Sequence, residues 1–185
     1  MAPKNKVRRE EIVVAALELI RDKGAEALNA RDLAAALGCS TQPIFSNFAS
    51  MDEIRAHVIA AATELYGSYI RDGIASEKYP PYKASGMAYI EFASREKELF
   101  KLLFMRDRTA EDKSPTGDFD SIVDIIVKNT GFDRETATFF HLEMWVSVHG
   151  IAVMMATNYL ELGMETVSEM LSDIYIGLRS RYERK

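Results

Sequence analysis

The C-terminal half of the chain places two histidines and a tryptophan at successive intervals of four residues: His141, Trp145 and His149. Side chains four residues apart lie on one face of a helix, so the three form a slowly turning polar stripe on an otherwise apolar segment. Imidazole groups can bind a metal ion, transfer protons or form hydrogen bonds with a ligand. Packing with each histidine satisfied by one hydrogen bond is the simplest interpretation, and contact with a ligand is the alternative.

Metal binding is disfavoured, because a stable site needs three or four ligands. The only carboxylate close in sequence, that of Glu143, falls on another side of the helix. Catalysis by His141 or His149 would need further groups, and no nucleophile elbow, phosphate-binding glycine loop or pair of carboxylates stands near either histidine. We therefore predict no catalytic residues, no metal site, no cofactor and no enzymatic activity.

Polar residues of a different kind gather near the N-terminus. Between residues 40 and 47, short hydrogen-bonding side chains predominate, as suits contact with base edges or phosphates. Four basic residues precede the first acidic one, Glu10; they could follow a phosphate backbone or enter a minor groove, although a basic N-terminus is often only a solvated tail. These candidate contacts are Lys4, Lys6, Arg8 and Arg9 in the basic segment and Ser40, Thr41, Gln42, Ser46 and Asn47 in the polar one.

The charge of the chain limits how nucleic acid could be bound. With 23 lysines and arginines against 28 aspartates and glutamates, the formal charge is -5, which excludes a uniformly basic nucleic-acid wrapper. Residues 1–50 carry seven basic and six acidic side chains, whereas residues 51–185 carry 16 and 22. Any DNA contact must therefore be local to the N-terminal segment, with few phosphate contacts and a shallow salt dependence.

Apolar residues recur at helical spacing along almost the whole chain, and alternating runs of β-branched residues are scarce, which predicts an all-α fold of about nine helices. Composition changes near residue 50, since 16 of the 18 aromatic residues follow it. We therefore predict a small domain over residues 1–50 and a helical body over residues 51–185. The predicted helices cover residues 7–23, 30–37, 41–47, a long helix that begins after Ser50, 81–93, 95–106, 118–130, 134–160 and 164–182.

Two very short predicted helices, 30–37 and 41–47, are joined by Gly38, Cys39 and Ser40, with Asn29 and Ser40 able to cap their N-termini. Short helices joined in this way and clamped by a longer first helix have the geometry of a helix-turn-helix, whose second helix enters the DNA major groove. Capped short helices separated by glycine also occur in many all-α domains. The geometry alone therefore leaves DNA binding open.

From Ile12 to Ile54 the sequence closely resembles the N-terminal domain of the TetR family of one-component transcriptional regulators. The resemblance extends over more than forty residues. It is carried by Ile12-x-x-Ala15-Ala16-x-x-Leu19-Ile20, Gly24, Asn29-x-Arg31-Asp32-Leu33-Ala34, Gly38-Cys39-Ser40 and Ile44-Phe45-x-x-Phe48 with Asp52-Glu53-Ile54.

The resemblance implies that residues 41–47 form a recognition helix whose exposed tip faces DNA. Two positions depart from the family pattern: Phe45 stands where members usually carry a phosphate-binding tyrosine, and Met51 where they usually carry a lysine. Both changes remove contacts with the DNA backbone rather than with bases. Together with the basic segment, the implied DNA-binding residues are Lys4, Lys6, Arg8, Arg9, Asn29, Arg31, Ser40, Thr41, Gln42, Pro43, Phe45, Ser46 and Asn47.

The body is rich in methionine and aromatic residues, which at helical spacing most often form core but also line adaptable apolar pockets. The strings Trp145-x-x-x-His149-Gly150 and Gly86-x-x-Tyr89-x-x-Phe92-Ala93 resemble the C-terminal domain of the TetR subgroup named for its Trp-His-Gly motif. That resemblance implies a body that binds a ligand and dimerises. The candidate ligand-facing residues are Tyr89, Phe92, Phe100, Leu103, Phe104, His141, Trp145 and His149.

The last two predicted helices carry apolar stripes that could pack inside the subunit or against a second copy. The resemblance implies that each subunit contributes two helices to a four-helix interface. A two-fold dimer would place two recognition helices about one DNA turn apart on a palindromic site. The candidate interface residues are Ile151, Met154, Met155, Tyr159, Met164, Val167, Leu171, Ile174 and Leu178.

These patterns predict a cytoplasmic, homodimeric regulator, a repressor rather than an activator, released from DNA by a small and largely apolar effector. The single cysteine, Cys39, fits a reducing compartment, and the longest segment without charge, 144–160, contains polar residues typical of a buried helix rather than a membrane span. The alternative is a helical ligand-binding or interaction module that has lost DNA binding, because Phe45 and Met51 are substitutions that such a loss would leave.

Overall fold

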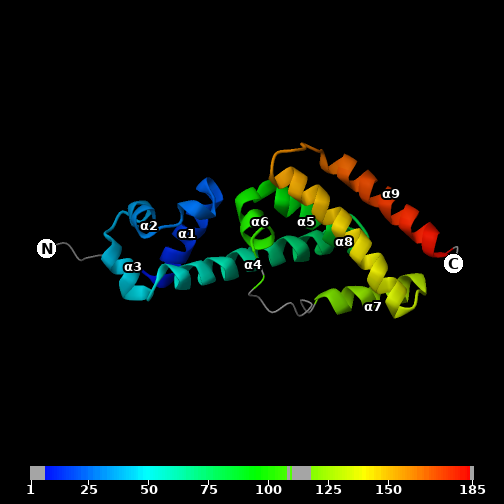
Figure 1. The fold of residues 1–185 in the computed structure, drawn as a ribbon, viewed down its shortest axis with the longest axis horizontal. Helices are drawn as coiled ribbons and strands as arrows, with labels where there is room; N and C mark the ends of the chain where they lie inside the picture. Colours follow the sequence, from blue (N-terminus) through cyan, green and yellow to red (C-terminus); the bar gives the residue numbers. More distant parts are fainter. Residues whose placement is uncertain (1–6, 108, 110–117, 184–185) are drawn as a thin grey trace. The chain divides into compact units, whose positions relative to one another are not determined.

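The computed structural model of the chain describes residues 7–107, 109 and 118–183. Its regular elements over those residues are nine α-helices and one 3-10 turn, Ala25–Ala27, which confirms the predicted all-α fold (Figure 1). The predicted DNA contacts Lys4 and Lys6 lie outside the described residues. The helices are α1 (Arg9–Lys23), α2 (Ala30–Ala36), α3 (Thr41–Asn47), α4 (Met51–Ala75), α5 (Pro81–Arg95), α6 (Lys97–Phe104), α7 (Asp118–Thr130), α8 (Arg134–Ala156) and α9 (Met164–Glu183).

The helices group into two compact units. The first, here called the N-terminal unit, contains the chain up to Ser68 together with Arg95–Arg106, and so includes α6. The second, the C-terminal unit, contains Tyr69–Ser94 and the chain from Asp107 onward. The long helix α4 contributes its first turns to the N-terminal unit and its last turns to the C-terminal one.

The N-terminal unit is built around a small aliphatic core. Helix α1 buries Ile12, Ala16, Leu19 and Ile20, which recur at intervals of three and four residues as the sequence predicted. The two short helices add Leu33 and Ile44, among others, and Phe48 follows α3 as a fully buried ring. Because the inward side of α3 is occupied by apolar residues, its polar side chains are left on the outside.

Side-chain capping explains where one of the two short helices begins. The Asn29 side chain accepts hydrogen bonds from the backbone N–H groups of Arg31 and Asp32, which confirms the predicted cap of α2. Ser40 occupies the N-cap position of α3 in extended conformation, but its side chain makes no capping hydrogen bond, so that part of the prediction is wrong.

A capping box forms only in part at the start of α4. The Ser50 hydroxyl accepts from the Glu53 N–H at 3.2 Å, as expected of the box. The Glu53 carboxylate, however, accepts from the backbone N–H of Ala49 rather than that of Ser50. It also pairs with Arg9, so the same carboxylate joins a helix start to a long-range contact.

The core of the C-terminal unit lies between α5, α7, α8 and α9. In Figure 1, α9 runs beside α8 and α7 lies against the first half of α8. A Cβ added at Gly86 of α5 would be 3.5 Å from both Val148 and Leu171, so α5 touches α8 and α9. One buried cluster of this unit joins Val123, Ile126, Ala137, Phe140 and Met144.

Helix α8 ends at Ala156, four residues before the predicted end at residue 160. Asn158 adopts a φ of 58°, a left-handed conformation that asparagine tolerates and that no continuing helix allows. The backbone N–H groups of Tyr159 and Leu160 both turn back to the carbonyl of Met154. Tyr159 therefore leaves the helical stripe on which the sequence placed it.

Helix α8 is also long and apolar enough, by length and composition alone, to cross a membrane, and it is the one such helix among the described residues. Core helices of folded domains pass the same test. In this structure 44% of its apolar window is buried against the rest of the chain, which accounts for one side of the helix.

Candidate functional site

The outward face of α3 carries four exposed side chains, those of Thr41, Gln42, Phe45 and Ser46. These residues are neighbours on the helix surface, because positions three and four apart lie on the same side. Ile44, on the opposite side, is fully buried and anchors the helix to the N-terminal unit. The structure thus presents together four of the residues that the sequence predicts to contact DNA, with Pro43 half-buried beside them.

Two polar side chains of α3 already make hydrogen bonds within the protein. The Ser46 hydroxyl donates to the carbonyl oxygen of Gln42 at 2.9 Å, so it is engaged with its own helix. The half-buried Asn47 amide donates to the carbonyl oxygens of Pro43 at 2.8 Å and Val7 at 3.2 Å. Asn47 therefore fixes the segment before α1 against the end of α3, an internal role that the sequence did not reveal.

Arg9 also has an internal role. Its guanidinium donates to the Asn47 carbonyl oxygen at 2.5 Å and forms an ion pair with Glu53. It lies 2.8 Å from His57 Nε2, and its central carbon stands 4.0 Å above the centre of the Phe48 ring. The planar, multidentate guanidinium thereby joins the C-terminal end of α3 to the first turns of α4.

The remaining predicted DNA contacts near α2 and α1 fall into two groups. Arg8 is exposed and pairs with Glu11 one turn along α1, while Asn29 uses its side chain to cap α2. Arg31, by contrast, is exposed, and its guanidinium has no hydrogen-bond or ion-pair partner among the described residues. An arginine in this state retains all of its donors for a phosphate or a base.

Two hydroxyl–imidazole pairs connect α5 to α8 in the C-terminal unit. The Tyr82 hydroxyl lies 3.1 Å from His141 Nδ1, and the Tyr89 hydroxyl lies 2.8 Å from His149 Nδ1. His141 and Tyr89 are buried, whereas His149 is half-buried. The sequence identified both histidines and Tyr89 as candidates, but Tyr82 emerges only from the fold, because its partner lies 59 residues away.

The surroundings of the two histidines favour their neutral forms. Burial lowers the pKa of His141 and that of His149, since a charged imidazolium is poorly solvated there. Burial likewise raises the pKa of the Tyr82 hydroxyl, with a smaller contribution from Tyr175. Neutral imidazoles and hydroxyls can each donate and accept, so both pairs are suited to holding α5 and α8 in register.

Trp145 completes the stripe but lies at the surface. Its indole stacks on the His149 imidazole with ring centroids 5.4 Å apart and an interplanar angle of 13°, and 46% of the tryptophan remains exposed. Phe92, another residue predicted to face a ligand, is fully buried and packs edge-on against Tyr69. The stripe therefore runs from the buried His141 outward to Trp145.

The predicted ligand-facing residues do not all belong to one unit. Phe100, Leu103 and Phe104 of α6 lie in the N-terminal unit, where Phe104 packs edge-on against Tyr66 with centroids 5.2 Å apart. The other five belong to the C-terminal unit. These five are Tyr89, Phe92, His141, Trp145 and His149.

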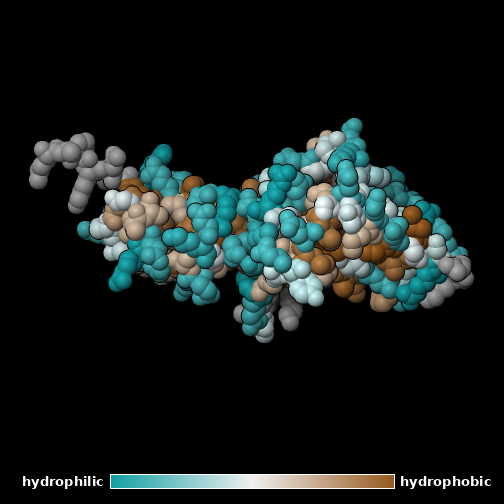
Figure 2. Space-filling view, turned by 90° about the horizontal axis from the view of Figure 1, so that it is seen from above, coloured by the Kyte–Doolittle hydropathy of each residue, from teal (hydrophilic) through white to brown (hydrophobic). Residues whose placement is uncertain are grey.

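The outer side of α8 exposes an apolar seam, whose residues are not among those predicted from the sequence. Phe139, Leu142 and Val146 are exposed and follow one another at intervals of three and four residues, a spacing that His149 and Val153 continue. Alternating intervals of three and four are typical of a helix that packs against another helix. The space-filling view in Figure 2 shows apolar side chains at the surface of this unit among hydrophilic ones.

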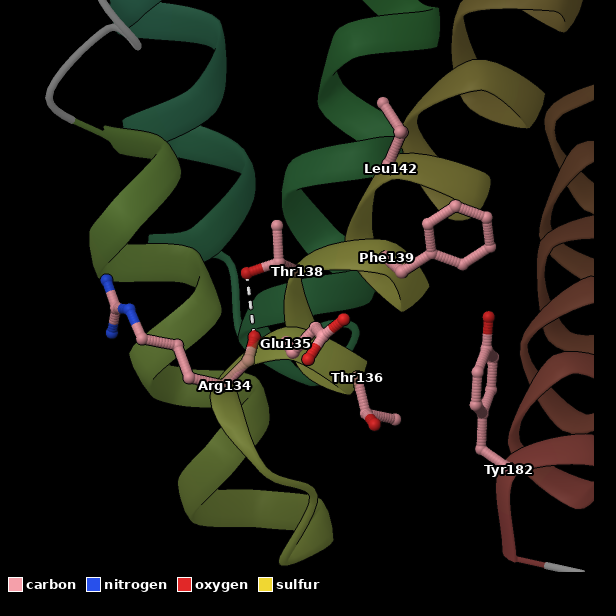
Figure 3. Close-up of a pocket in the computed structure, with 7 residues that line it drawn as sticks. All are labelled: Arg134, Glu135, Thr136, Thr138, Phe139, Leu142 and Tyr182. Carbon is pink, nitrogen blue, oxygen red and sulfur yellow. Dashed lines mark hydrogen bonds between the residues drawn. The ribbon is translucent and has the colours of Figure 1, made fainter. Parts of the chain in front are cut away.

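A shallow groove opens at the start of this seam, with Phe139 and Leu142 among its lining residues. It is lined by residues of the first turns of α8 and by Tyr182 near the end of α9, and Figure 3 shows Phe139 and Tyr182 projecting toward it from the two helices. The Tyr182 hydroxyl donates to the Glu143 carboxylate at 2.6 Å, and Arg181 pairs with the same carboxylate at 2.9 Å. Glu143 is thus committed to joining α8 and α9, away from the histidine stripe.

Several residues predicted for a dimer interface face the interior of their own unit. Val167 and Leu171 of α9 are buried, as are Ile151 and Met155 of α8, because α8 and α9 pack on each other and on α5. Tyr159 is highly exposed but lies in the turn after α8. The remaining predicted interface residues, Met154, Met164, Ile174 and Leu178, are partly buried.

Over the described residues, no group of three or more histidine, cysteine, aspartate or glutamate side chains is arranged to hold a metal ion. The N-terminal unit contains a helix-turn-helix whose second helix, α3, has an exposed outward face. The C-terminal unit is a helical body that contains two hydroxyl–imidazole pairs. That combination defines a helix-turn-helix DNA-binding protein with an additional helical domain.

Comparison with known families agrees with this class. Residues 12–58 match the family described as "Bacterial regulatory proteins, tetR family", and residues 82–174 match "Tetracyclin repressor-like, C-terminal domain". The chain belongs to the TetR family of transcriptional regulators. No match to a curated protein was found.

Solved structures share the fold at low sequence identity. A protein of unknown function from Rhodococcus sp. RHA1 is 18% identical, with a TM-score of 0.73 over 97% of this chain and 100% of that one. A protein described as a TetR family transcriptional regulator from Vibrio parahaemolyticus is 16% identical, with a TM-score of 0.63 over 91% and 97%. A TetR variant from Acinetobacter baumannii AYE in complex with minocycline is 16% identical, with a TM-score of 0.58 over 97% and 98%.

Proposed function

We propose that the chain is a homodimeric repressor that binds a palindromic DNA operator and is released by a small, largely apolar effector, without catalysing a reaction. The observation that carries this proposal is the exposed face of α3 in a segment that matches the TetR N-terminal family. Residues 1–50 would read DNA and residues 51–185 would bind the effector and dimerise. Expression in the cytoplasm, where the operator would be located, is part of the proposal.

Direct DNA contacts are assigned to the exposed groups. Thr41 and Gln42 carry hydrogen-bonding side chains suited to base edges, and Arg31 has a free guanidinium for a phosphate or a base. Ser40 and the basic residues Lys4, Lys6 and Arg8 would add further contacts. Arg9 and Asn47 would act by positioning α3, because their polar groups are used within the unit.

Dimerisation is assigned to the α8 seam. Phe139, Leu142 and Val146 form a row of exposed apolar side chains on α8. Such a row on a protein surface is rare unless a partner covers it. A second copy would cover them by placing its own α8 and α9 against the same surface, as a two-fold dimer requires. The groove near Tyr182 lies at the edge of this surface.

Effector binding is assigned to the C-terminal unit. Tyr89, Trp145 and His149 offer aromatic faces with polar handles, which suits an apolar molecule that carries a few hydrogen-bonding groups. Helix α4 runs through both units, so a displacement of its last turns would be carried along the helix to its first turns. Helix α4 would then have two positions, one that allows DNA binding and one that does not. An effector that binds more tightly to the protein with α4 in the second position would shift the dimer away from its DNA-binding state.

The proposal is tested by selecting DNA from a random duplex library with the purified full-length protein at low salt, then measuring affinity for the winning sequence. We expect a palindrome with half-sites about one helical turn apart and a stoichiometry of two chains per site. Enrichment of no sequence over the starting library would overturn the proposal.

Loss of DNA binding is the competing interpretation, because Phe45 and Met51 replace two residues that bind phosphates in the family. In a functional regulator, Phe45→Tyr and Met51→Lys should raise affinity by a similar factor for the operator and for unrelated DNA, since backbone contacts carry no sequence information. A module that has lost DNA binding would remain inactive in both variants. Gel-shift titrations of the two variants on operator and scrambled duplexes separate the cases.

A further inference from the structure

Phe45 is the one large apolar side chain on the exposed face of α3. The residue is 47% exposed, and its ring makes no aromatic or cation–π contact with another described residue. Core packing on this helix is supplied by the fully buried Ile44 and by Phe48 just beyond it, so Phe45 is not needed to anchor α3. Its neighbours on the helix surface are Thr41, Gln42 and Ser46.

A phenylalanine in this position has no atom that can bind a phosphate or read a hydrogen-bonding pattern. In the major groove, however, one base carries an apolar group at its edge, the 5-methyl group of thymine, which phenylalanine and other apolar side chains contact. The ring of Phe45 and a thymine methyl group would each lose exposure to water on contact. The other exposed residues of α3 would supply hydrogen bonds to the neighbouring base pairs.

We propose that Phe45 reads a thymine at one position in each half-site of the operator by contact with its methyl group. The inference rests on the proposed DNA-binding function and makes it more specific, since it names a base and the chemical group that is recognised. It also changes the meaning of the departure at Phe45: losing a phosphate-binding hydroxyl would leave the ring as a determinant of sequence specificity.

The test replaces thymines of the selected operator, one at a time, with deoxyuridine, which pairs in the same way but lacks the methyl group. At one thymine in each half-site we expect the wild-type affinity to fall about fourfold, the effect of exposing one methyl group. Replacement in both half-sites should weaken binding about fifteenfold if the two contacts are independent. All other thymines should tolerate the replacement.

Phe45→Ala is the decisive variant. It should bind the thymine and deoxyuridine operators with equal affinity, because the ring that distinguishes them is gone. Ser46→Ala changes an adjacent exposed residue and should keep the wild-type ratio, as should Phe45→Tyr, which retains the ring. Because Phe45 is exposed, its truncation should leave the thermal midpoint by circular dichroism close to that of the wild type.

Two results would overturn the inference. The first is a wild-type protein that binds every deoxyuridine operator as tightly as the thymine operator. The second is a Phe45→Ala variant that keeps the wild-type preference for thymine. A selection that enriches no DNA would overturn the proposed function itself, and this inference with it, so failure at the two levels is distinguishable.

Discussion

The two units place polar and apolar groups in opposite ways. In the N-terminal unit the core is mainly aliphatic, and α3 turns a face that includes Thr41 and Gln42 toward solvent. In the C-terminal unit, the α5–α8 contact contains two hydroxyl–imidazole pairs, while the outer side of α8 exposes Phe139, Leu142 and Val146. A polar face suits a polar polymer such as DNA, whereas an apolar face requires an apolar partner.

The polar contacts made inside each unit also have different roles. Arg9 joins three parts of the N-terminal unit through charged hydrogen bonds at a partly exposed position, where water weakens each interaction. His141 is buried, which lowers its pKa and favours the neutral form, and its hydrogen bond with Tyr82 specifies how α5 lies on α8. The first arrangement fixes the reading helix, and the second fixes the body.

The largest expected effect comes from making the outer face of α8 charged, as in Val146→Glu. If that face is the dimer interface, burying a carboxylate there should weaken dimerisation at least about a hundredfold, because an unpaired buried charge costs several kcal/mol. Operator affinity should fall with it. Sedimentation velocity measures the change directly.

Ile125→Glu is the matched control, because Ile125 is an exposed apolar residue on another helix, α7. This control should remain dimeric. A Val146→Glu protein that keeps the wild-type dimerisation constant would show that the apolar face of α8 has another purpose.

An intermediate effect is expected from Arg9→Ala. Losing the hydrogen bond to Asn47 and the pair with Glu53 should lower the free energy of unfolding by about 1 kcal/mol, the value being modest because the guanidinium is partly exposed. Affinity for the operator should also fall, since α3 loses an anchor. Urea unfolding and gel-shift titration provide the two measurements.

Arg8→Ala removes a neighbouring exposed pair with Glu11 and should change stability by less than about 0.5 kcal/mol. Arg9→Lys should recover only part of the loss, because an ammonium group lacks the fork of donors. Equal losses for Arg8→Ala and Arg9→Ala would contradict the positioning role.

The smallest effect concerns pH. Burial lowers the pKa of His141 below the value of about 6.5 that an unfolded histidine has, so the unfolded state binds the proton more readily. Stability is therefore complete above pH 6.5 and decreases as the pH falls below it toward the folded-state pKa. His141→Gln should reduce this decrease, as judged from urea unfolding at pH 7.5 and pH 5.5.

His149→Gln should reduce it less, because His149 is only half-buried. A His141→Gln variant with the same pH dependence as the wild type would show that its protonation is not what destabilises the body.

The helical elements were largely predictable, because helix starts and ends depend on nearby residues. The predicted range 41–47 coincides with α3, and Asn29 caps α2 as expected. The end of α8 was missed because the left-handed conformation of Asn158 is one of several that its type allows. The seam of Phe139, Leu142 and Val146 was readable as a pattern, but nothing local distinguished it from the buried stripe.

By itself, the sequence determined the all-α class, the helix-turn-helix and the family, because periodicity, capping residues and motif spacing are properties of short segments. Only the tertiary structure decided which apolar stripe of α8 faces inward, that Arg9 and Asn47 are used inside the unit, and that Tyr82 is the partner of His141. Those outcomes depend on which distant surfaces compete to cover one another. The local sequence determines which side chains lie on each face of a helix. The packing of the folded chain determines which of those faces remains exposed to a partner.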